Sequence, residues 1–295
     1  MSQKHPVIAV TGSSGAGTTT VKRAFDNIFR REQINAAVIE GDSLHSLDRM
    51  AFRAAVAEAA KDGNHHFSHF GPEANHFDKI EETFRMYGET GTCKRRYYIH
   101  SEAEAKELNA HFGTSLTPGQ FTPWEDIPAN SDILFYEGLH GMVKTDKFDA
   151  GKYVDLSIGV VPNVNLEWIQ KIHRDKAERG YSAEATVDTI LRRMPDYINY
   201  ITPQFTYSDI NFQRVATVDT SNPFIARDIP TPDESFVVVR FRNPKGIDFP
   251  YYLSMINDSF MSRPNTLVVP GGKMSFSLEL ILTPIMHEMI EKKNK

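Results

Sequence analysis

The chain of 295 residues contains a single cysteine, Cys93, so an internal disulfide and a switch made of two thiols are excluded. No apolar run approaches the roughly 20 residues that a membrane-spanning helix needs. Only four apolar residues follow Lys4 and His5, too few for the core of a signal peptide. These features predict a cytoplasmic protein that has no membrane partner.

Positive charge is also scarce, since the formal net charge is -5. This balance argues against a nucleic-acid-binding surface, while local clusters of Arg and Lys favour a small anionic ligand. Hydrophobic residues make up 40% of the chain, enough for a sizeable core. We interpret residues 1–295 as one domain, with no internal repeat.

A glycine-rich segment at residues 12–19 lacks the lysine that its motif normally contains. The segment follows an apolar strand expected at residues 6–10 and precedes a helix expected at 21–31. Its spacing fits the phosphate-binding loop G-x-x-x-x-G-K-[ST], whose backbone N–H groups and following helix N-terminus hold phosphates. Thr18 replaces the lysine, and Thr19 occupies the metal-ligand position. The predicted nucleotide-binding residues are Gly12, Ser13, Ser14, Gly15, Ala16, Gly17, Thr18 and Thr19.

Apolar runs that alternate with helical patterns predict a mostly parallel α/β sheet covered by helices on both faces. We expect strands at 36–40, 133–136, 156–161, 235–241 and 266–269, and a short one at 94–100. We expect helices at 50–61, 76–87, 166–179, 183–200 and 275–292. Residues from about 107 to 130 are rich in Pro, Gly and polar residues and indicate an excursion over the surface.

Two carboxylates follow predicted strands, where ligands bind in parallel sheets. Asp42 could accept a proton from a substrate hydroxyl, although an aspartate here is also a common turn residue. Glu137 follows four apolar residues and could hold Mg²⁺ together with the Thr19 hydroxyl.

The missing positive charge has a candidate source on the helix expected at 166–179. Lys171, Arg174 and Asp175 share one face of that helix, which would act as a lid over the phosphates. The alternative is an ordinary solvated helix face carrying ion pairs.

Further cationic and aromatic side chains suit a phosphorylated substrate. His45 and Arg49 could bind a phosphate group. Tyr98 and His100, preceded by Arg95 and Arg96, could donate to a sugar phosphate, whereas an aromatic strand is more often core. Three histidines lie close together but have no supporting Cys or acidic residues, so they predict a metal site only weakly: His65, His66 and His69.

Several segments together resemble bacterial phosphoribulokinase over nearly the whole chain. They are the loop at 12–19 and the segments 40–45 (EGDSLH), 135–141 (FYEGLHG), 165–175 (NLEWIQKIHRD), 190–194 (ILRRM), 209–214 (DINFQR), 218–224 (VDTSNPF) and 242–250 (RNPKGIDFP). The least distinctive part is the excursion at 101–130. Bacterial members also have threonine at the position of Thr18.

The resemblance implies a single-domain P-loop kinase of the nucleotide-monophosphate-kinase type, with a mixed, mostly parallel sheet. It implies transfer of the γ-phosphoryl group of ATP, with Mg²⁺, to the C1 hydroxyl of D-ribulose 5-phosphate. By resemblance, Asp42 is the base, Glu137 the acid of the second motif, and Asp175 a further essential carboxylate. Lys171 and Arg174 act on the transferring group. The sugar-phosphate positions are His45, Arg49, Tyr98, His100 and Arg179.

The resemblance also bears on regulation and assembly. Bacterial members are typically octamers that NADH activates and AMP inhibits, and Arg240 and Arg263 match positions of the effector site. We therefore expect a homo-oligomer with NADH as an allosteric activator. The thioredoxin switch of plant-type members is not expected, because it needs a cysteine pair.

Two other functions stay open from the sequence. One is a kinase similar to uridine or pantothenate kinase that acts on an uncharged alcohol, which would not need His45, Arg49 and Arg179. The other is a binding protein that senses a nucleotide or NADH and has lost catalysis, which could dispense with Asp42.

Overall fold

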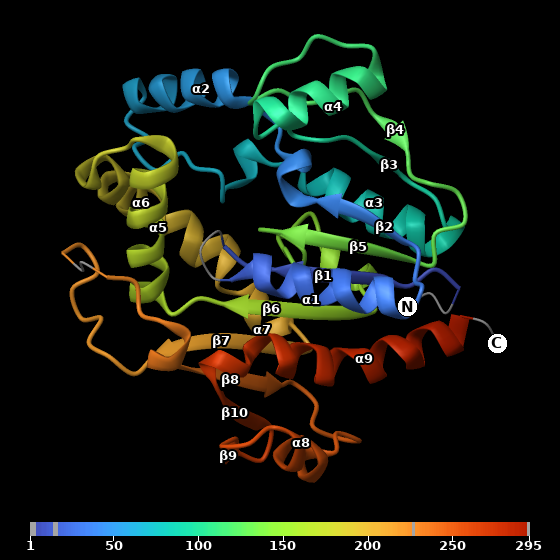
Figure 1. Ribbon diagram of the computed structural model, residues 1–295. Coiled ribbons are helices and arrows are strands. Elements are labelled where there is room, and N and C mark those ends of the chain that lie inside the picture. The colour runs from blue at the N-terminus through green and yellow to red at the C-terminus, as the bar shows by residue number, and fades with distance from the viewer. Residues whose placement is uncertain (1–3, 14–16, 226–227, 294–295) are drawn as a thin grey trace.

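The computed structural model describes residues 4–13, 17–225 and 228–293, except for the side chains of residues 178 and 179 (Figure 1). Its helices are α1 (Thr18–Arg31), α2 (Arg49–Lys61), α3 (Phe77–Thr90), α4 (Glu102–Phe112), α5 (Val164–Arg179), α6 (Ala183–Asp196), α7 (Gln204–Tyr207), α8 (Phe249–Met255) and α9 (Met274–Lys293). Its strands are β1 (Val7–Thr11), β2 (Ala36–Glu40), β3 (Lys94–Arg95), β4 (Glu125–Asp126), β5 (Ile133–Gly138), β6 (Leu156–Val161), β7 (Ile210–Ala216), β8 (Ser235–Phe241), β9 (Phe260–Arg263) and β10 (Thr266–Pro270).

Eight strands form one mixed sheet in the order β2-β5-β1-β6-β7-β8-β10-β9. The first five are parallel, and β8, β10 and β9 continue the sheet with antiparallel pairings. The sequence prediction of a mostly parallel, mixed sheet flanked by helices is confirmed. We propose that the chain forms a single domain. The support for this is that β8, β9 and β10, from residues 235–295, extend the same sheet that contains β1.

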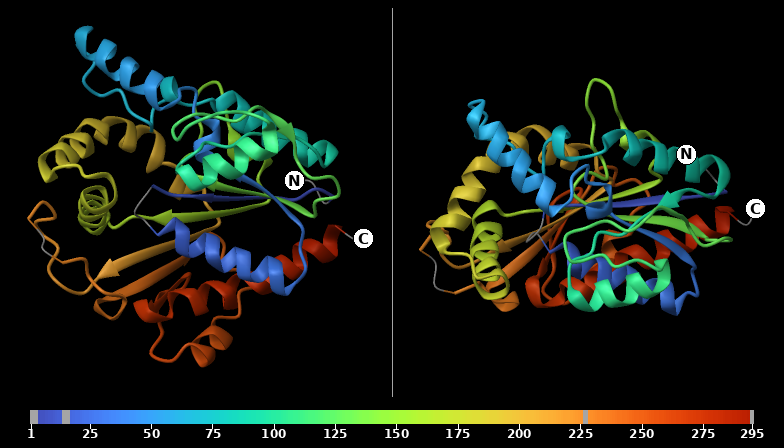
Figure 2. Two further views of the ribbon diagram at one scale, coloured as in Figure 1. Left: turned by 45° about the horizontal axis from the view of Figure 1, so that its top comes forward. Right: turned by 90° about the horizontal axis from the view of Figure 1, so that it is seen from above.

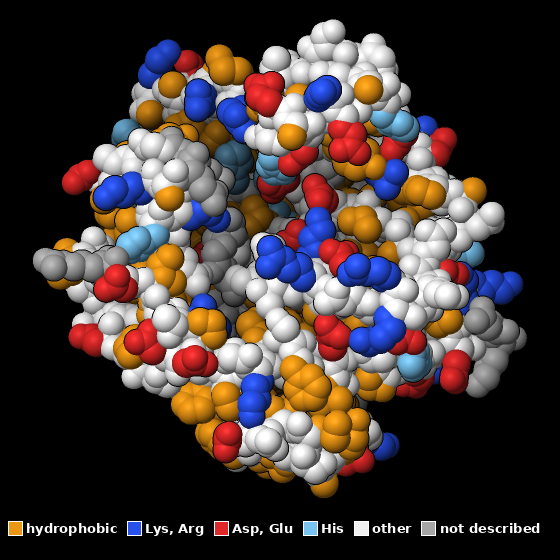
Figure 3. Space-filling model, viewed as in Figure 1, with side chains coloured by type: hydrophobic (Ala, Val, Ile, Leu, Met, Phe, Trp, Pro, Cys, Tyr) orange, Lys and Arg blue, Asp and Glu red, His pale blue; other side chains and the backbone are white. Residues whose placement is uncertain are grey.

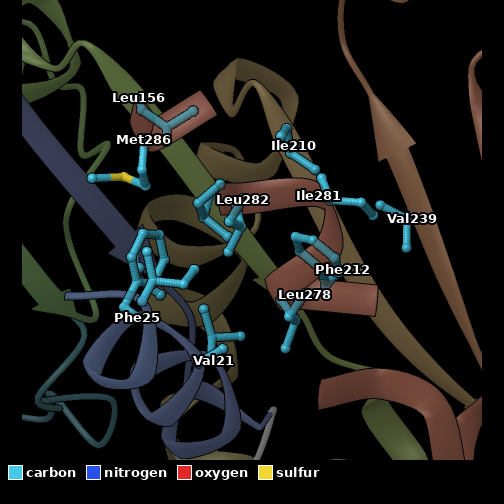
Figure 4. Packing of buried hydrophobic residues seen from close by; sticks show 14 of the residues in the cluster. Val21, Phe25, Leu156, Ile210, Phe212, Val239, Leu278, Ile281, Leu282 and Met286 are labelled. Carbon is cyan, nitrogen blue, oxygen red and sulfur yellow. The ribbon is translucent and has the colours of Figure 1, made fainter. Parts of the chain in front are cut away.

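Alternate residues of the central strands pack on opposite faces of the sheet. On one face, Ile8, Phe135 and Ile158 pack against α1 and α9. Figure 4 shows Val21 and Phe25 of α1 beside Leu278, Leu282 and Met286 of α9, against side chains of β6, β7 and β8. Because both faces of these strands are covered, they have the continuous apolar composition that predicted them.

The other face of the sheet is covered mainly by α3. Its Phe77, Ile80 and Phe84 pack on Ala9 of β1 and Tyr136 of β5. Figure 2 shows the two layers on either side of the sheet, with α3 opposite α1 and α9. The carboxyl ends of β1, β2 and β5 therefore meet at one edge between these layers, where a ligand can reach them.

Several elements differ from the sequence prediction. The strand expected at 94–100 is only Lys94–Arg95 long, and the excursion contains the helix α4. β7 lies inside the sheet, although no strand was expected there, and α8 and β9 were missed as well. The helix expected at 183–200 ends at Asp196 and continues as a wider turn, Tyr197–Ile201.

Among the described residues, no helix combines the length and the apolar character required to cross a lipid bilayer.

Candidate active site

A cavity of about 270 Å³ lies at the carboxyl ends of β1, β2 and β5. Figure 3 shows this face of the molecule hollowed near its centre, with acidic and histidine side chains gathered on the wall above. The walls include Gly12, Thr18, Asp42, His100, Glu104 and Glu137. The three strand ends that the sequence singled out therefore converge on one cavity.

The glycine-rich loop leaves β1 directly into this cavity. The Gly12 N–H donates to the Gly138 carbonyl oxygen at 3.1 Å, and α1 begins at Thr18. A Cβ on Gly12 would lie 2.9 Å from the Thr18 Cγ2 atom and from the Val160 carbonyl oxygen, so no larger residue fits. The first turn of α1 carries no acidic residue, which leaves its N-terminus favourable for an anion.

The loop is tied to α5 through a buried carboxylate. The Ser13 hydroxyl donates to Glu167, whose other oxygen accepts from the Tyr197 hydroxyl at 3.2 Å. Burial raises the pKa of Glu167, and these two hydrogen bonds oppose the rise. Sequence reasoning missed Glu167, although it lies in the segment 165–175. The predicted nucleotide-binding residues Ser14, Gly15 and Ala16 lie outside the described residues.

Glu137 is the penultimate residue of β5, beside the start of α1, and forms a hydrogen bond with the Thr18 side chain. Burial raises the pKa of Glu137, and the carboxylates of Asp42 and Glu40 raise it further. A carboxylate in such surroundings is stabilised by a cation. The Thr19 side chain is exposed and makes no contact with Glu137 that is comparable to that of Thr18.

A magnesium ion fits this donor set. Mg²⁺ binds oxygen, keeps several waters and needs only one or two carboxylates beside the phosphates of a nucleotide. No cluster of three or more His, Cys, Asp or Glu side chains within the described parts of the chain could hold a metal ion on its own. The three histidines at 65, 66 and 69 accordingly form no such cluster.

Lys22 is a cation near the cavity that sequence reasoning missed. It lies one turn after Thr18 on α1, and its ammonium group is 2.7 Å from Glu40. Burial lowers the pKa of Lys22, but the hydrogen bond with Glu40 and the charges of Glu40 and Glu137 raise it overall. The spacing of four residues from Thr18 was the available signal, because helical side chains lean toward the N-terminus.

Asp42 lies in a short turn, Gly41–Leu44, directly after β2. Its carboxylate is 3.3 Å from Nε2 of His45 and 3.8 Å from Nε2 of His100. Burial alone would raise the pKa of Asp42, but His45, with His100 and His69, holds it well below its usual range. Asp42 is therefore ionised at neutral pH and half exposed to the cavity.

Arg49 begins α2 next to the excursion. The Arg49 N–H donates to the Gly119 carbonyl oxygen at 2.9 Å, and a Cβ on Gly119 would lie 2.7 Å from the Arg49 Cβ. Gly119 also has a positive φ of 102°, which favours glycine. Within the described residues the Arg49 guanidinium forms no hydrogen bond or ion pair, so it is available to an anion.

The excursion forms one wall of the cavity and is not a loop on a remote part of the surface. Tyr98 forms an isolated antiparallel β-bridge with Phe121. The Tyr98 ring contacts the His100 ring, with 5.0 Å between centroids. The His100 N–H donates to Glu104 of α4 at 2.8 Å. The structure thus brings His45 and His100 to Asp42, with Tyr98 packed against His100.

The two arginines before this segment have structural partners. Arg95 pairs with Glu125 at 2.9 Å. Arg96 donates to the carbonyl oxygens of Ser43 and His45 at 2.8 and 2.7 Å. Their contribution to a sugar-phosphate site stays a prediction, and the contacts of Arg96 also support the turn that carries Asp42.

Three charged residues follow Glu167 along α5: Lys171, Arg174 and Asp175. The buried Asp175 carboxylate contacts the Lys171 ammonium group and is 3.1 Å from the Arg174 guanidinium. Burial and the charge of Arg193 lower the pKa of Lys171 to about 8. Lys171 lies one helical turn after Glu167, the residue that accepts from the Ser13 hydroxyl of the phosphate loop. Arg179 is the last residue of α5, and its side chain lies outside the described part.

The two predicted effector residues lie in another part of the sheet. Arg240 of β8 and Arg263 of β9 both pair with Thr266 of β10, so the three form one row on one face. Arg240 also lies opposite Asn211, near the beginning of β7. This row is therefore at the end of the sheet away from the cavity, and both arginines are exposed.

Comparisons with known proteins give one family. The profile of the Phosphoribulokinase / Uridine kinase family matches residues 7–221. The phosphoribulokinase of Nitrobacter vulgaris is 60% identical over 295 residues, which is all of both chains. The chromosomal phosphoribulokinase of Cupriavidus necator is also 60% identical, over 100% of this chain and 99% of its own length. A solved structure of phosphoribulokinase from Rhodobacter spheroides superposes with a TM-score of 0.90 at 52% identity, over all of both chains.

Proposed function

The chain belongs to the Phosphoribulokinase / Uridine kinase family, and from that premise we propose how its residues carry out the reaction of a phosphoribulokinase. That reaction transfers the γ-phosphoryl group of ATP to the C1 hydroxyl of D-ribulose 5-phosphate and gives ribulose 1,5-bisphosphate. The uridine-kinase-like and non-catalytic alternatives are not favoured, since full-length relatives that share up to 60% of the residues are phosphoribulokinases. The observation that carries the residue roles is the ionised Asp42 in the cavity beside the phosphate loop.

The nucleotide phosphates bind at the start of α1. Ser13 and Gly17 supply backbone N–H groups around them, while the Gly12 N–H holds the loop to β5 through the Gly138 carbonyl oxygen. Glu137 would hold Mg²⁺, with the Thr19 hydroxyl as the ligand that the motif predicts, and the bound ion would neutralise charge on the phosphates. The raised pKa of the buried Glu137 supports this role, because a bound cation offsets the cost of ionising it.

Asp42 acts as the general base. The C1 hydroxyl lies against its carboxylate, and the proton passes to Asp42 as the oxygen attacks the γ-phosphorus. The Arg49 side chain binds the 5-phosphate, and the charge of His45 attracts it. Tyr98, His100 and Arg179 contribute to the same substrate site. The phosphate at one end therefore fixes the position of the hydroxyl at the other.

Lys171 and Arg174 neutralise the negative charge that develops on the transferring group. Asp175 holds both cations on one face of α5, and the bond between Ser13 and Glu167 keeps this helix beside the phosphate loop. This arrangement offsets the absence of a lysine at position 18.

Replacing Arg49 with Ala tests the substrate assignment. We expect the KM for ribulose 5-phosphate to rise about 10- to 100-fold, the effect of losing one hydrogen bond to a charged group, with little change in the KM for ATP. Steady-state kinetics with each substrate varied in turn measure this. Arg85→Ala, which removes an exposed arginine paired with Glu89, is the matched control. A similar rise in both KM values would contradict a role of Arg49 in sugar-phosphate binding.

Regulation and assembly complete the proposal. The arginine pair of β8 and β9 forms an exposed cationic row that suits a phosphate-bearing effector such as NADH. We also expect the chain to form a homo-oligomer, with the octamer of bacterial relatives as the expected size.

A further inference from the structure

Asn75 faces His45 across a short antiparallel pairing. The Ser46 N–H donates to the Ala74 carbonyl oxygen at 2.9 Å, and the His76 N–H donates to the Leu44 carbonyl oxygen at 3.0 Å. Residues 45 and 75 are thus directly opposite each other, and Asn75 is 93% buried, with a relative exposure of 7%. Its side-chain oxygen lies 2.8 Å from Nδ1 of His45.

The orientation of the Asn75 amide is fixed by its other partners. Its nitrogen donates to the carbonyl oxygens of His69 and Gly71 at 2.8 and 2.7 Å, so both N–H bonds are in use. The segment between these carbonyls is held from the other side by His140, whose Nε2 lies 3.0 Å from the Phe70 carbonyl oxygen. The Asn75 oxygen must therefore face His45, where it can only accept a hydrogen bond.

This geometry determines which atoms of His45 carry protons. Nδ1 must be protonated to donate to Asn75, and Nε2 lies 3.3 Å from the Asp42 carboxylate, which is also only an acceptor. A neutral ring protonated at Nδ1 would direct a lone pair at that carboxylate. We propose that Asn75 is a positioning residue that holds His45 as a cation, with Nδ1–H on Asn75 and Nε2–H on the catalytic carboxylate of Asp42.

The surroundings of His45 support this assignment. Burial lowers the pKa of His45, but Asp42 and then Asn75 raise it above its ordinary value. The opposing charge is that of Arg193 of α6. The His69 ring lies 5.0 Å away, and burial and the charge of His45 lower its pKa well below the ordinary value; the Arg96 guanidinium donates to the His45 carbonyl oxygen. His100 faces the far side of Asp42, and the pKa of the buried His140 is lowered to about 3, so that ring is neutral.

The cation has two consequences for the reaction, which rest on the proposed function. It keeps Asp42 ionised before the substrate binds, and it adds a fixed positive charge to the site that binds the anionic sugar phosphate. Loss of Asn75 should therefore weaken sugar-phosphate binding at high pH first, where His45 loses its charge.

The test measures the His45 ring directly. Protein labelled with ¹⁵N in its histidine rings is titrated by NMR, and the His45 signals are assigned by their loss in His45→Gln. The wild-type enzyme should show both ring nitrogens protonated at pH 7, with titration above that of a free histidine. In Asn75→Leu the titration should move down by about one pH unit, the effect of losing one hydrogen bond to a charged group.

Kinetics supply a second readout. The basic limb of kcat/KM for ribulose 5-phosphate, measured at saturating ATP, should move to lower pH in Asn75→Leu. It should move to higher pH in Asn75→Asp, whose carboxylate favours the cation. Ser68→Ala is the control, because Ser68 supports the same segment through Asp196 and Phe70 but does not contact His45.

Two results would overturn the proposal. One is a neutral His45 ring at pH 7 in the wild-type enzyme, a measurement that does not depend on the folding of Asn75→Leu. The other is a His45 titration that is the same in Asn75→Leu and Ser68→Ala. Because the NMR titration is made without substrate, its outcome is separate from the identity of the sugar phosphate.

Discussion

Replacing Asp42 with Asn is expected to lower kcat by about 10²- to 10⁴-fold, the usual contribution of a general base. The amide retains the shape of the carboxylate but cannot accept the proton of the C1 hydroxyl. Phosphate binding should persist, because the loop that begins at Gly12 and the N-terminus of α1 do not depend on Asp42. Stopped assays of ADP formation, with calorimetry of ATP binding, measure the two effects separately.

The control for this variant is Asp126→Asn, which removes an exposed carboxylate paired with Lys94 on β3. It should leave kcat unchanged. An Asp42→Asn enzyme with nearly normal kcat would contradict the assignment of Asp42 as the base.

Replacing Lys171 with Ala is expected to lower kcat by about 10³- to 10⁵-fold, the range found for a single cation acting on a transferring phosphoryl group. The loop lacks its own lysine, so Lys171 has no neighbouring lysine in the motif to substitute for it. Lys176→Ala, which alters an exposed lysine on the same helix, should have little effect.

The pH dependence of kcat/KM for ATP tests the role of Lys171 independently. Because the pKa of Lys171 is lowered to about 8, its positive charge is present below that pH and is lost above it. In the wild-type enzyme kcat/KM for ATP should therefore fall as the pH rises through about 8, and Lys171→Ala should lack this limb. A change confined to KM would instead show that Lys171 binds substrate and transition state equally.

The parts of the fold that could be predicted are those with a local signal. β1, β5 and β6 are buried on both faces, and a continuous apolar run marks each of them. β7 was missed because Asn211, Gln213 and Arg214 interrupt its apolar residues, although it lies between β6 and β8. α4 was missed because Ala105 is its only buried residue among those described, but Ser101 and Glu104 formed a helix-start signal that could have revealed it.

The residues of the candidate site also fall into two groups, those that a local sequence signal predicts and those that it does not. Asp42 and Glu137 could be predicted because a polar residue that follows a buried parallel strand lies at the ligand-binding edge. Asn75 and Arg96 could not, because they reach His45 and Ser43 from 30 and 53 residues away through loops without a sequence pattern. The supporting residues of the site therefore become visible only when the chain is folded.

The central claim is that this cavity transfers a phosphoryl group to a phosphorylated sugar, and the rate of ADP release with Mg-ATP tests it most directly. Wild-type enzyme and Asp42→Asn would be assayed with D-ribulose 5-phosphate and with three unphosphorylated alcohols: ribulose, uridine and pantothenate. We predict rapid turnover of ribulose 5-phosphate by the wild-type enzyme alone and no comparable turnover of the other three. Faster turnover of an unphosphorylated alcohol would contradict the account, because the cations around His45 and Arg49 would then have no phosphate to bind.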